Sequence, residues 1–168
     1  MVPCPVCREK LNVIGSRNRI WKQMNGDRSN LRIRRLKCDD CLTIHHELPD
    51  ILVPHKHYDA ASIEAVVHPQ NKIKDRLPVG AESSTLSRWI RWFSLWLTDA
   101  IRCLRAIMLR YFMQVPNPSS PRDSSVLHLI GEFVGIEDGW LTRLVRPIVN
   151  THSWLQTRFA YLSSLNRS

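Results

Sequence analysis

Two Cys-x-x-Cys pairs constrain this 168-residue chain more than any other feature of its sequence. Cys4 and Cys7 form the first pair, and Cys38 and Cys41 form the second after a gap of 30 residues. A two-residue spacing lets a tight turn aim both sulfurs at one point, and two such turns complete a tetrahedron. A thioredoxin-type redox site would instead need one pair in a β-α-β setting. The pairs therefore predict one structural Zn²⁺ ion held by four thiolates.

The segment between the pairs has the pattern of a β-hairpin. Strand candidates at residues 19–24 and 31–37 flank Asn25-Gly26, a strong tight-turn signal. Such a hairpin brings its two ends together, as a shared metal site requires. Alternation then places Leu31, Ile33 and, after a slip, Leu36 on one side, with arginines largely opposite. We expect these arginines to be Arg32, Arg34 and Arg35.

The rest of the chain has mainly helical signals. A proline-bracketed apolar run at residues 51–53 suggests an extended arm or edge strand. Asp59 is a plausible cap for a helix that ends at Val67. A long amphipathic helix is expected from Ser84 to about Met113, capped by Ser83. The predicted fold is α+β, with a zinc ribbon at 1–58, a helical, helix-turn-helix-like region at 59–114, a linker at 115–125 and a small helical tail at 126–168.

Within that tail, residues 126–134 and 140–161 have apolar residues at helical spacing, interrupted by Gly135 and Pro147. The fifth cysteine, Cys103, lies in the apolar pattern of the long helix and is interpreted as a core residue. Several charges interrupt the apolar stretch 89–113, so a membrane-spanning helix is not expected. No secretory segment opens the chain, which predicts the reducing cytoplasm.

Charge favours a polyanionic partner. Lys and Arg number 24 against 15 acids, which gives a formal net charge of +9. Residues 8–37 carry ten of these bases and only two acids, a local charge of +8. Four thiolates around one Zn²⁺ would lower the total to about +7, so the excess persists. Nucleic acid or an anionic surface is the partner such a balance favours.

Two segments are candidates for the nucleic-acid contacts. The first is the arginine-rich hairpin strand. The second is the segment 72–93, whose turn at Gly80 and following helix look like a helix-turn-helix unit. An amphipathic helix with a solvated arginine face would have the same sequence pattern, and this alternative stays open. The candidate residues are Arg32, Arg34, Arg35, Lys37, Ser84, Thr85, Ser87, Arg88 and Arg91.

Four histidines near the second cysteine pair raise an enzymatic alternative. Paired histidines beside a zinc turn are typical of metal-dependent nucleases of the His-Asn-His type. That site also needs an Asn and a second metal-binding His, for which the chain offers only Asn71 and the distant His128. Packing and hydrogen bonding explain the histidines more simply, and no catalytic activity is expected. The four residues are His45, His46, His55 and His57.

The strings CPVC, IRRLKCDDC, IHHELPDILVPHKHY and ESSTLSRWIRWF carry a family resemblance. The chain resembles, over about residues 3–95, an uncharacterised bacterial family with transposase-type zinc ribbons. The resemblance implies DNA binding around mobile elements, with the four cysteines as zinc ligands and with Arg88 and Arg91 on the helix after the turn. It supplies no catalytic residue, and the 73 residues after Leu95 are too few for a transposase core.

Two functions from different classes follow from these observations. The first is binding of nucleic acid, most simply double-stranded DNA, with RNA as an open variant. The second is a protein-interaction or assembly module, because Trp89, Trp92 and Trp96 could leave apolar surface for a partner. A continuous basic face would favour DNA, whereas an exposed tryptophan patch would favour a protein partner.

Overall fold

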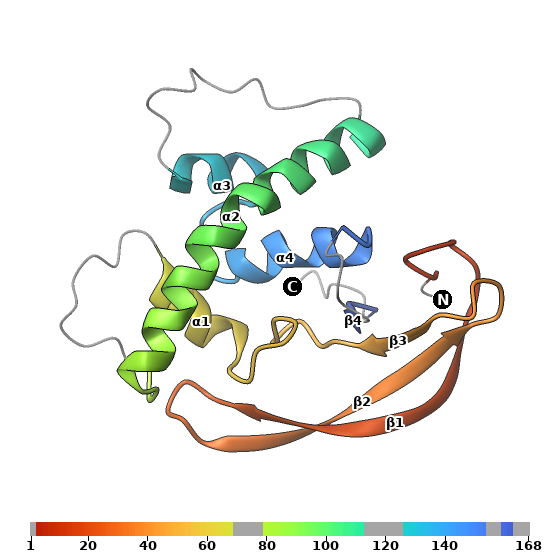
Figure 1. Ribbon diagram of the computed structural model, residues 1–168, viewed down its shortest axis with the longest axis horizontal. Coiled ribbons are helices and arrows are strands. Elements are labelled where there is room, and N and C mark those ends of the chain that lie inside the picture. The colour runs from red at the N-terminus through yellow and green to blue at the C-terminus, as the bar shows by residue number, and fades with distance from the viewer. Residues whose placement is uncertain (1–2, 69–78, 113–125, 154–158, 163–168) are drawn as a thin grey trace.

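A four-stranded sheet and four helices make up the part of the chain that the computed structural model describes, residues 3–68, 79–112, 126–153 and 159–162 (Figure 1). The sheet has the strand order β1-β2-β3-β4. β1 to β3 are antiparallel, and β4 pairs with β3 in parallel. The α+β class is therefore confirmed. The elements are β1 (Leu11–Lys22), β2 (Arg28–Cys38), β3 (Ile44–Glu47), α1 (Ala60–Val67), α2 (Ser83–Phe112), α3 (Val126–Val134), α4 (Trp140–Asn150) and β4 (Phe159–Ala160).

The hairpin β1–β2 turns at Asn25-Gly26, as the sequence predicts. The backbone of Gly26 has a φ of 91°, in the left-handed region that favours glycine. Its strands are longer than expected, because β1 begins at Leu11. Pairing shifts register between Val13 and Gly15, so a bulge interrupts the alternation there. This irregularity hid the first half of β1 from a period-two pattern.

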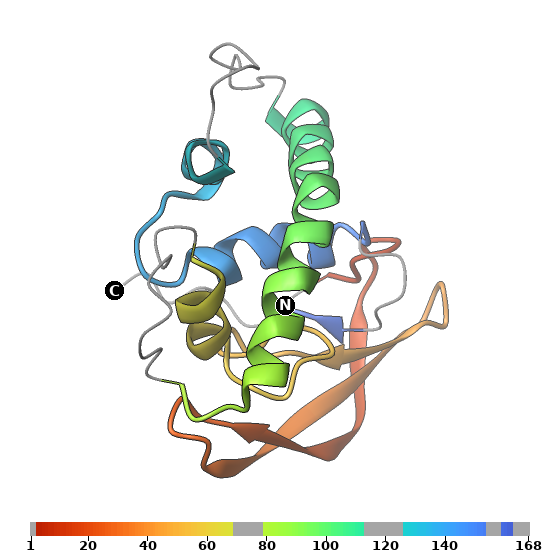
Figure 2. The same ribbon diagram turned by 60° about the vertical axis from the view of Figure 1, so that its left-hand side comes forward.

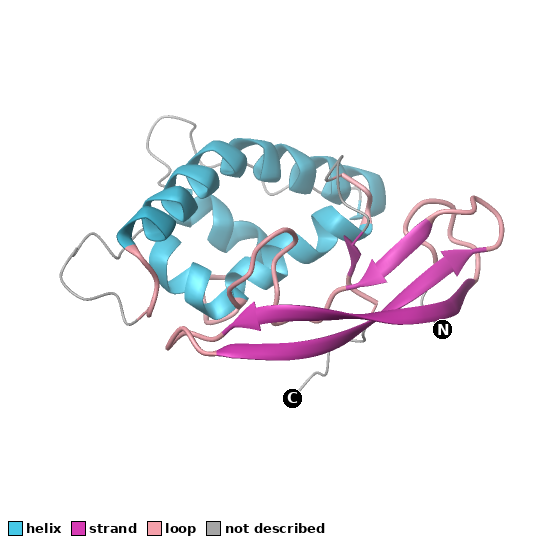
Figure 3. Ribbon diagram, turned by 60° about the horizontal axis from the view of Figure 1, so that its bottom comes forward, coloured by secondary structure: helices cyan, strands magenta, loops and turns pink. Residues whose placement is uncertain are grey.

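The two ends of the hairpin bury opposite faces. Near the tip, Leu31 packs against the main core and Ile33 is buried, and the intervening Arg32 is exposed. At the cysteine end Leu36 and Cys38 are buried, although they alternate with Ile33. The extra residue of the bulge lies in β1, and β2 itself continues without a slip. The prediction that Leu31, Ile33 and Leu36 share one side is therefore wrong. The strong twist of the hairpin, to which bulges contribute, explains this exchange of faces (Figure 3).

The segment between β3 and α1 corrects a second expectation. Residues 51–53 form no strand of the sheet. Leu52 makes only an isolated antiparallel bridge with Asp59, and the strand of this region is β3, before Pro49. Leu52 and Val53 are fully buried in the core. The hydroxyl of Tyr161, from the far end of the chain, donates to the carbonyl of Leu52 at 2.6 Å. Burial under distant residues, with one isolated bridge, therefore holds this segment in place of a strand ladder.

Local signals located α1 and α2 well. The Asp59 side chain accepts a hydrogen bond from the Ser62 amide at 2.7 Å and caps α1, which ends at Val67 as expected. α2 spans 30 residues, close to the predicted range, but Ser83, the expected cap, is its first helical residue. It runs across α1 and α4 (Figure 2). Trp89, Phe93 and Leu97 form part of its buried stripe.

The helical prediction for residues 140–161 holds only in part. α4 ends at Asn150, and Phe159–Ala160 forms β4 instead of a helical turn. His152 has a φ of 57°, which stops the helix. The Asn150 side chain then donates to the Tyr161 carbonyl and accepts from its amide, both at 2.9 Å. The predicted linker at 115–125 lies outside the described residues.

One main core joins the ribbon to the helices. It includes Tyr58 from the segment before α1, Trp89 from α2, Trp140 from α4 and Tyr161 after β4. Cys103 is half-buried and packs against this core. None of the described helices combines the length and hydropathy needed to cross a bilayer.

Candidate metal centre and basic surfaces

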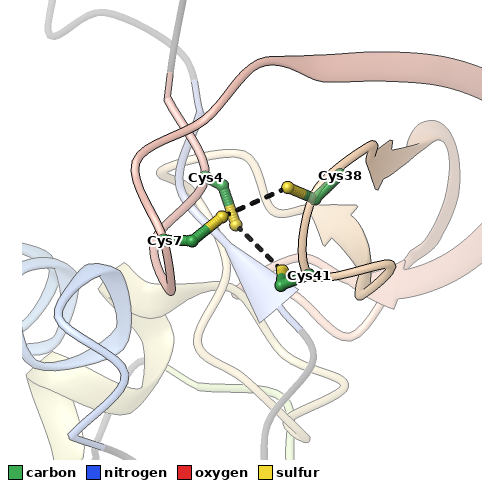
Figure 4. Close-up of side chains that lie close together, drawn as sticks. All are labelled: Cys4, Cys7, Cys38 and Cys41. Atoms are coloured by element: carbon green, nitrogen blue, oxygen red, sulfur yellow. Dashed lines mark hydrogen bonds between the residues drawn. The ribbon is translucent and has the colours of Figure 1, made fainter.

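Four cysteine sulfurs converge at the end of the hairpin opposite to its tip (Figure 4). The Sγ atoms of Cys4 and Cys41 are 3.7 Å apart, and those of Cys7 and Cys38 are 3.3 Å apart. All four Sγ atoms lie within 4.8 Å of one another. The structure thus brings together the four residues that the spacing singled out. The cluster has the composition and size of a metal site.

The same local geometry builds both cysteine turns. In each turn the residue directly after the second cysteine has a left-handed backbone, with a φ of 72° at Arg8 and 57° at Leu42. The Cys4 amide donates to the Glu9 carbonyl at 2.8 Å, and the Cys38 amide donates to the Thr43 carbonyl at 3.0 Å. Both turns therefore fold back on themselves and point two sulfurs inward.

The environment of the cluster combines burial with hydrogen bonding. Cys4 and Cys38 are fully buried, and Ala160 and Leu162 pack against them from the far end of the chain. Burial raises the pKa of the Cys4 thiol. Hydrogen bonds from Thr43 lower the pKa of Cys41 to about 6, which favours the thiolate, the form that binds metal.

His45 is a site residue that the sequence did not single out from its neighbours. Its side chain is 2% exposed, and its Nε2 lies 3.4 Å from the Sγ of Cys4. Burial lowers the pKa of His45, which favours the neutral ring, in which one ring nitrogen carries a proton. A neutral ring can donate Nε2–H to the Cys4 thiolate, the kind of contact that orients a metal ligand.

The other three histidines near the second cysteine pair lie near Phe159 or at the surface. The ring centroid of His46 lies 5.9 Å from that of Phe159, and the centroid of His55 lies 5.4 Å from it. His57 is exposed. Asn71 and the side chain of His128 lie outside the described parts of the structure. Within the described residues, His46 and His55 therefore make ring contacts with Phe159, and His45 contacts Cys4.

The four ribbon candidates for nucleic-acid contact do not share one face. Arg32 and Arg34 are exposed, whereas Arg35 and Lys37 alternate with them and are half-buried. The Arg34 guanidinium forms a bidentate ion pair with Glu47, with both N–O distances at 2.6 Å. Arg32 therefore has the freer charge of the two exposed arginines.

The candidates on α2 lie in its first turns. Ser84, Ser87, Arg88 and Arg91 are exposed, and Thr85 is half-buried. The Arg88 guanidinium donates to the Thr85 hydroxyl at 3.0 Å. The expected first helix of a helix-turn-helix unit falls on residues 72–78, outside the described residues. The segment just before α2 is held at the hairpin tip, because the Gly80 amide donates to the Met24 carbonyl at 2.7 Å.

The three tryptophans of α2 do not form an exposed patch. Trp89 is buried, and Trp92 and Trp96 are half-buried against the core. The rings of Trp92 and Trp96 stack with centroids 5.5 Å apart and an interplanar angle of 14°. Stacking and core contact thus cover part of the apolar surface of these rings.

A sheet of N-terminal strands, a four-cysteine cluster and a helical layer define this protein as an α+β protein with a cysteine ribbon. The family described as "Domain of unknown function (DUF6431)" matches residues 4–89, and the chain belongs to this family. The match includes all four cysteines and ends in the first turns of α2. Neither a curated protein nor a solved structure matches the chain.

Proposed function

We propose that this protein is a zinc-ribbon protein that binds double-stranded DNA and has no catalytic activity of its own. The observation that carries the proposal is the solvent-facing side of the hairpin near its tip. Arg28, Asn30 and Arg32 are exposed there on β2, and Asn18 and Ile20 are exposed opposite them on β1. A two-stranded ribbon with such side chains has the width and polarity to enter the major groove of DNA.

Zinc is the proposed metal because the sulfur geometry suits it. Zn–S bonds of about 2.3 Å in a tetrahedron require sulfur atoms about 3.8 Å apart. The distances of 3.7 and 3.3 Å within the cysteine cluster need only small adjustments to meet that value. Four thiolates leave no coordination position for water, so the ion would stabilise the ribbon without acting as a Lewis acid.

The proposed role is that of a DNA-binding module related to those of transposases or of a regulator. The family resemblance seen in the sequence and the local charge of +8 at residues 8–37 both support it. The reducing cytoplasm is the proposed location, because there thiols persist and bind metal. α2 would add Arg88 and Arg91 as phosphate contacts next to the hairpin tip.

The test is the salt dependence of binding to a 20-base-pair duplex, measured by fluorescence anisotropy on the full zinc-loaded chain. Log affinity should fall with log salt by about 0.9 per phosphate neutralised. The variant R28Q/R32Q removes two exposed charges and should lower that slope by about 1 to 2. Arg34 is kept, because its loss would leave Glu47 without its partner.

The matched control K10Q/R102Q also removes two exposed charges, outside the outer face of the hairpin. It should change the affinity less than R28Q/R32Q does. A salt slope near zero for the wild-type protein, or equal losses in both double variants, would contradict the proposal that the hairpin contacts phosphates.

A further inference from the structure

A basic pocket lies where the hairpin, the segment before α1 and the start of α2 meet. Its volume is about 360 Å³. Lys22 comes from the end of β1, Lys56 and Tyr58 from the segment before α1, and Thr85 and Arg88 from α2. These segments are far apart in sequence, which is why the pattern along the chain gave no sign of the pocket.

Positive charge is concentrated in this pocket. Lys22, Lys56 and Arg88 line it together with two exposed histidines, and none of its described lining residues is acidic. Among the described residues, none of these three cations has an ion pair with a carboxylate. Three converging cations without a counter-charge form an anion site that an incoming ligand can neutralise.

The walls of the pocket are held in place before any ligand arrives. The Lys22 amide donates to the His57 carbonyl at 2.7 Å, and the Lys22 carbonyl accepts from the Asp59 amide at 3.0 Å. The rings of Tyr58 and Trp89 meet edge to face with centroids 4.9 Å apart. Backbone pairing and ring packing therefore fix the spacing between the lysines and Arg88.

Lys56, one of the three cations, is half-buried and lies over an aromatic ring. Its Nζ lies 3.8 Å from the ring centroid of Trp92. Burial lowers the pKa of Lys56 to about 8, so the charged form is disfavoured in the free protein. A half-buried lysine without a carboxylate partner among the described residues is unfavourable for folding, and such residues concentrate at functional sites. An anion in the pocket would reverse that disadvantage.

We propose that this pocket binds a phosphate group and, resting on the DNA-binding function proposed above, that the group belongs to the DNA backbone. Lys22, Lys56 and Arg88 would surround the phosphate oxygens, and the Thr85 hydroxyl would donate a further hydrogen bond. The neighbouring hairpin would then lie against the same duplex, with the pocket fixing its register. The volume accommodates a phosphate together with part of its sugar.

Two probes test the proposal on the full zinc-loaded chain: pyrophosphate, followed by amide shifts in ¹H–¹⁵N spectra, and a 20-base-pair duplex, followed by anisotropy. Pyrophosphate should shift the amides of Lys22, His57 and Thr85 first. The variant K56M/R88Q should weaken binding of both probes by about tenfold or more. The duplex salt slope should also fall by about 0.9, the value for one phosphate.

Two controls separate a site from general charge and from misfolding. K10Q/R102Q removes the same charge, and Arg102 lies 14 residues, or about 21 Å, along α2 from Arg88. It should weaken pyrophosphate binding less than twofold. The urea midpoint of K56M should equal or exceed that of the wild type, because the variant removes a disfavoured buried charge. R88K should retain most of the affinity.

The outcomes for the pocket and for the proposed function are distinct. If the duplex binds and only R28Q/R32Q weakens it, the pocket is refuted and DNA binding stands. If pyrophosphate binds in the pocket but no duplex binds at low salt, the phosphate site stands and its assignment to DNA is refuted. Equal binding of pyrophosphate by K56M/R88Q and K10Q/R102Q would overturn the pocket outright.

Discussion

At the scale of single residues, two polar side chains next to the cysteines act on their sulfur atoms. His45 contacts the Cys4 sulfur from a fully enclosed position, and Thr43 lowers the pKa of Cys41. Both residues belong to the short segment at and before β3. The sequence suggested the four thiols through their spacing alone. It could not separate His45 from His46, because adjacent residues of a strand point to opposite sides and only tertiary packing decides which side meets the cluster.

The first prediction concerns His45. Replacing it with Phe keeps a ring in the same space but removes the donor to the Cys4 thiolate. Loss of an outer-shell partner typically lowers metal affinity by 10- to 100-fold, and we expect about tenfold for zinc. Competition with a chromophoric chelator measures this. H57F, a change at an exposed histidine outside the cluster, is the control. Equal affinities in the two variants would show that the contact is without effect.

Lys56 gives a prediction about pH. Its pKa is lowered to about 8 in the folded state, from an ordinary value near 10.5. Between these values the unfolded chain holds a proton that the folded chain has released, so this residue's contribution to stability becomes more favourable as pH rises. The stability advantage of K56M over the wild type should therefore be largest at or below pH 8 and shrink toward pH 10. Urea unfolding of both proteins at several pH values measures the difference. Other titrating groups are common to both and cancel.

At the scale of elements, one side chain of α1 attaches α4, and with it the tail, to the rest of the molecule. Glu64 of α1 is buried, and its two carboxylate oxygens accept from the amides of Gly139 and Leu141 at 2.7 and 2.8 Å. These amides belong to the N-terminus of α4, where hydrogen-bonding groups lack partners within the helix and negative charge is favourable. The cap of α4 therefore comes from another helix, 75 residues earlier.

The prediction for this contact is a loss of stability in E64A. Two buried amides lose a charged acceptor, so the free energy of unfolding should fall by about 2 to 3 kcal/mol. E64Q retains one acceptor oxygen and should lose less. D99N removes the same charge from an exposed surface pair on α2 and should change stability by about 0.5 kcal/mol or less. Urea denaturation of the zinc-loaded proteins gives all three values. A loss in E64A as small as in D99N would contradict the capping role.

Predictability from sequence follows the range of the interactions. Asp59 caps α1 through a bond to a residue three positions away, and the turn at Asn25-Gly26 depends on these two residues alone. Both features could therefore be predicted from the sequence. The strand β4 depends on pairing with β3, more than 100 residues earlier, and residues 159–160 had only a helical apolar pattern of their own. The basic pocket likewise needs three distant segments. The burial of opposite hairpin faces depends on twist, which no alternation pattern reports.

At the scale of the whole molecule, two separate hydrophobic clusters hold the fold. The larger contains the helices and the hairpin tip. The smaller consists of Leu11, Leu36, Cys4, Cys38 and the C-terminal residues Ala160 and Leu162. Only the smaller cluster includes the proposed metal ligands. Ala160 and Leu162 thus cover the cysteine cluster, while α2 and α4 rest on a core that contains none of its four cysteines.

Metal removal should therefore unfold one end of the molecule before the other. Without the ion, four thiols that approach within 4.8 Å lose their common partner, and the small cluster has too little apolar area to persist alone. Hydrogen exchange after chelation should rise in residues 4–16, in 35–47 and in 159–162. Amides of α1, α4 and the first half of α2 should stay protected, because their core is intact. Re-addition of zinc should restore the protection of these amides. The H45F variant should lose this protection at a lower chelator concentration than the wild type. Loss of protection at equal rates in both clusters would show that the metal site and the helical core form one cooperative unit.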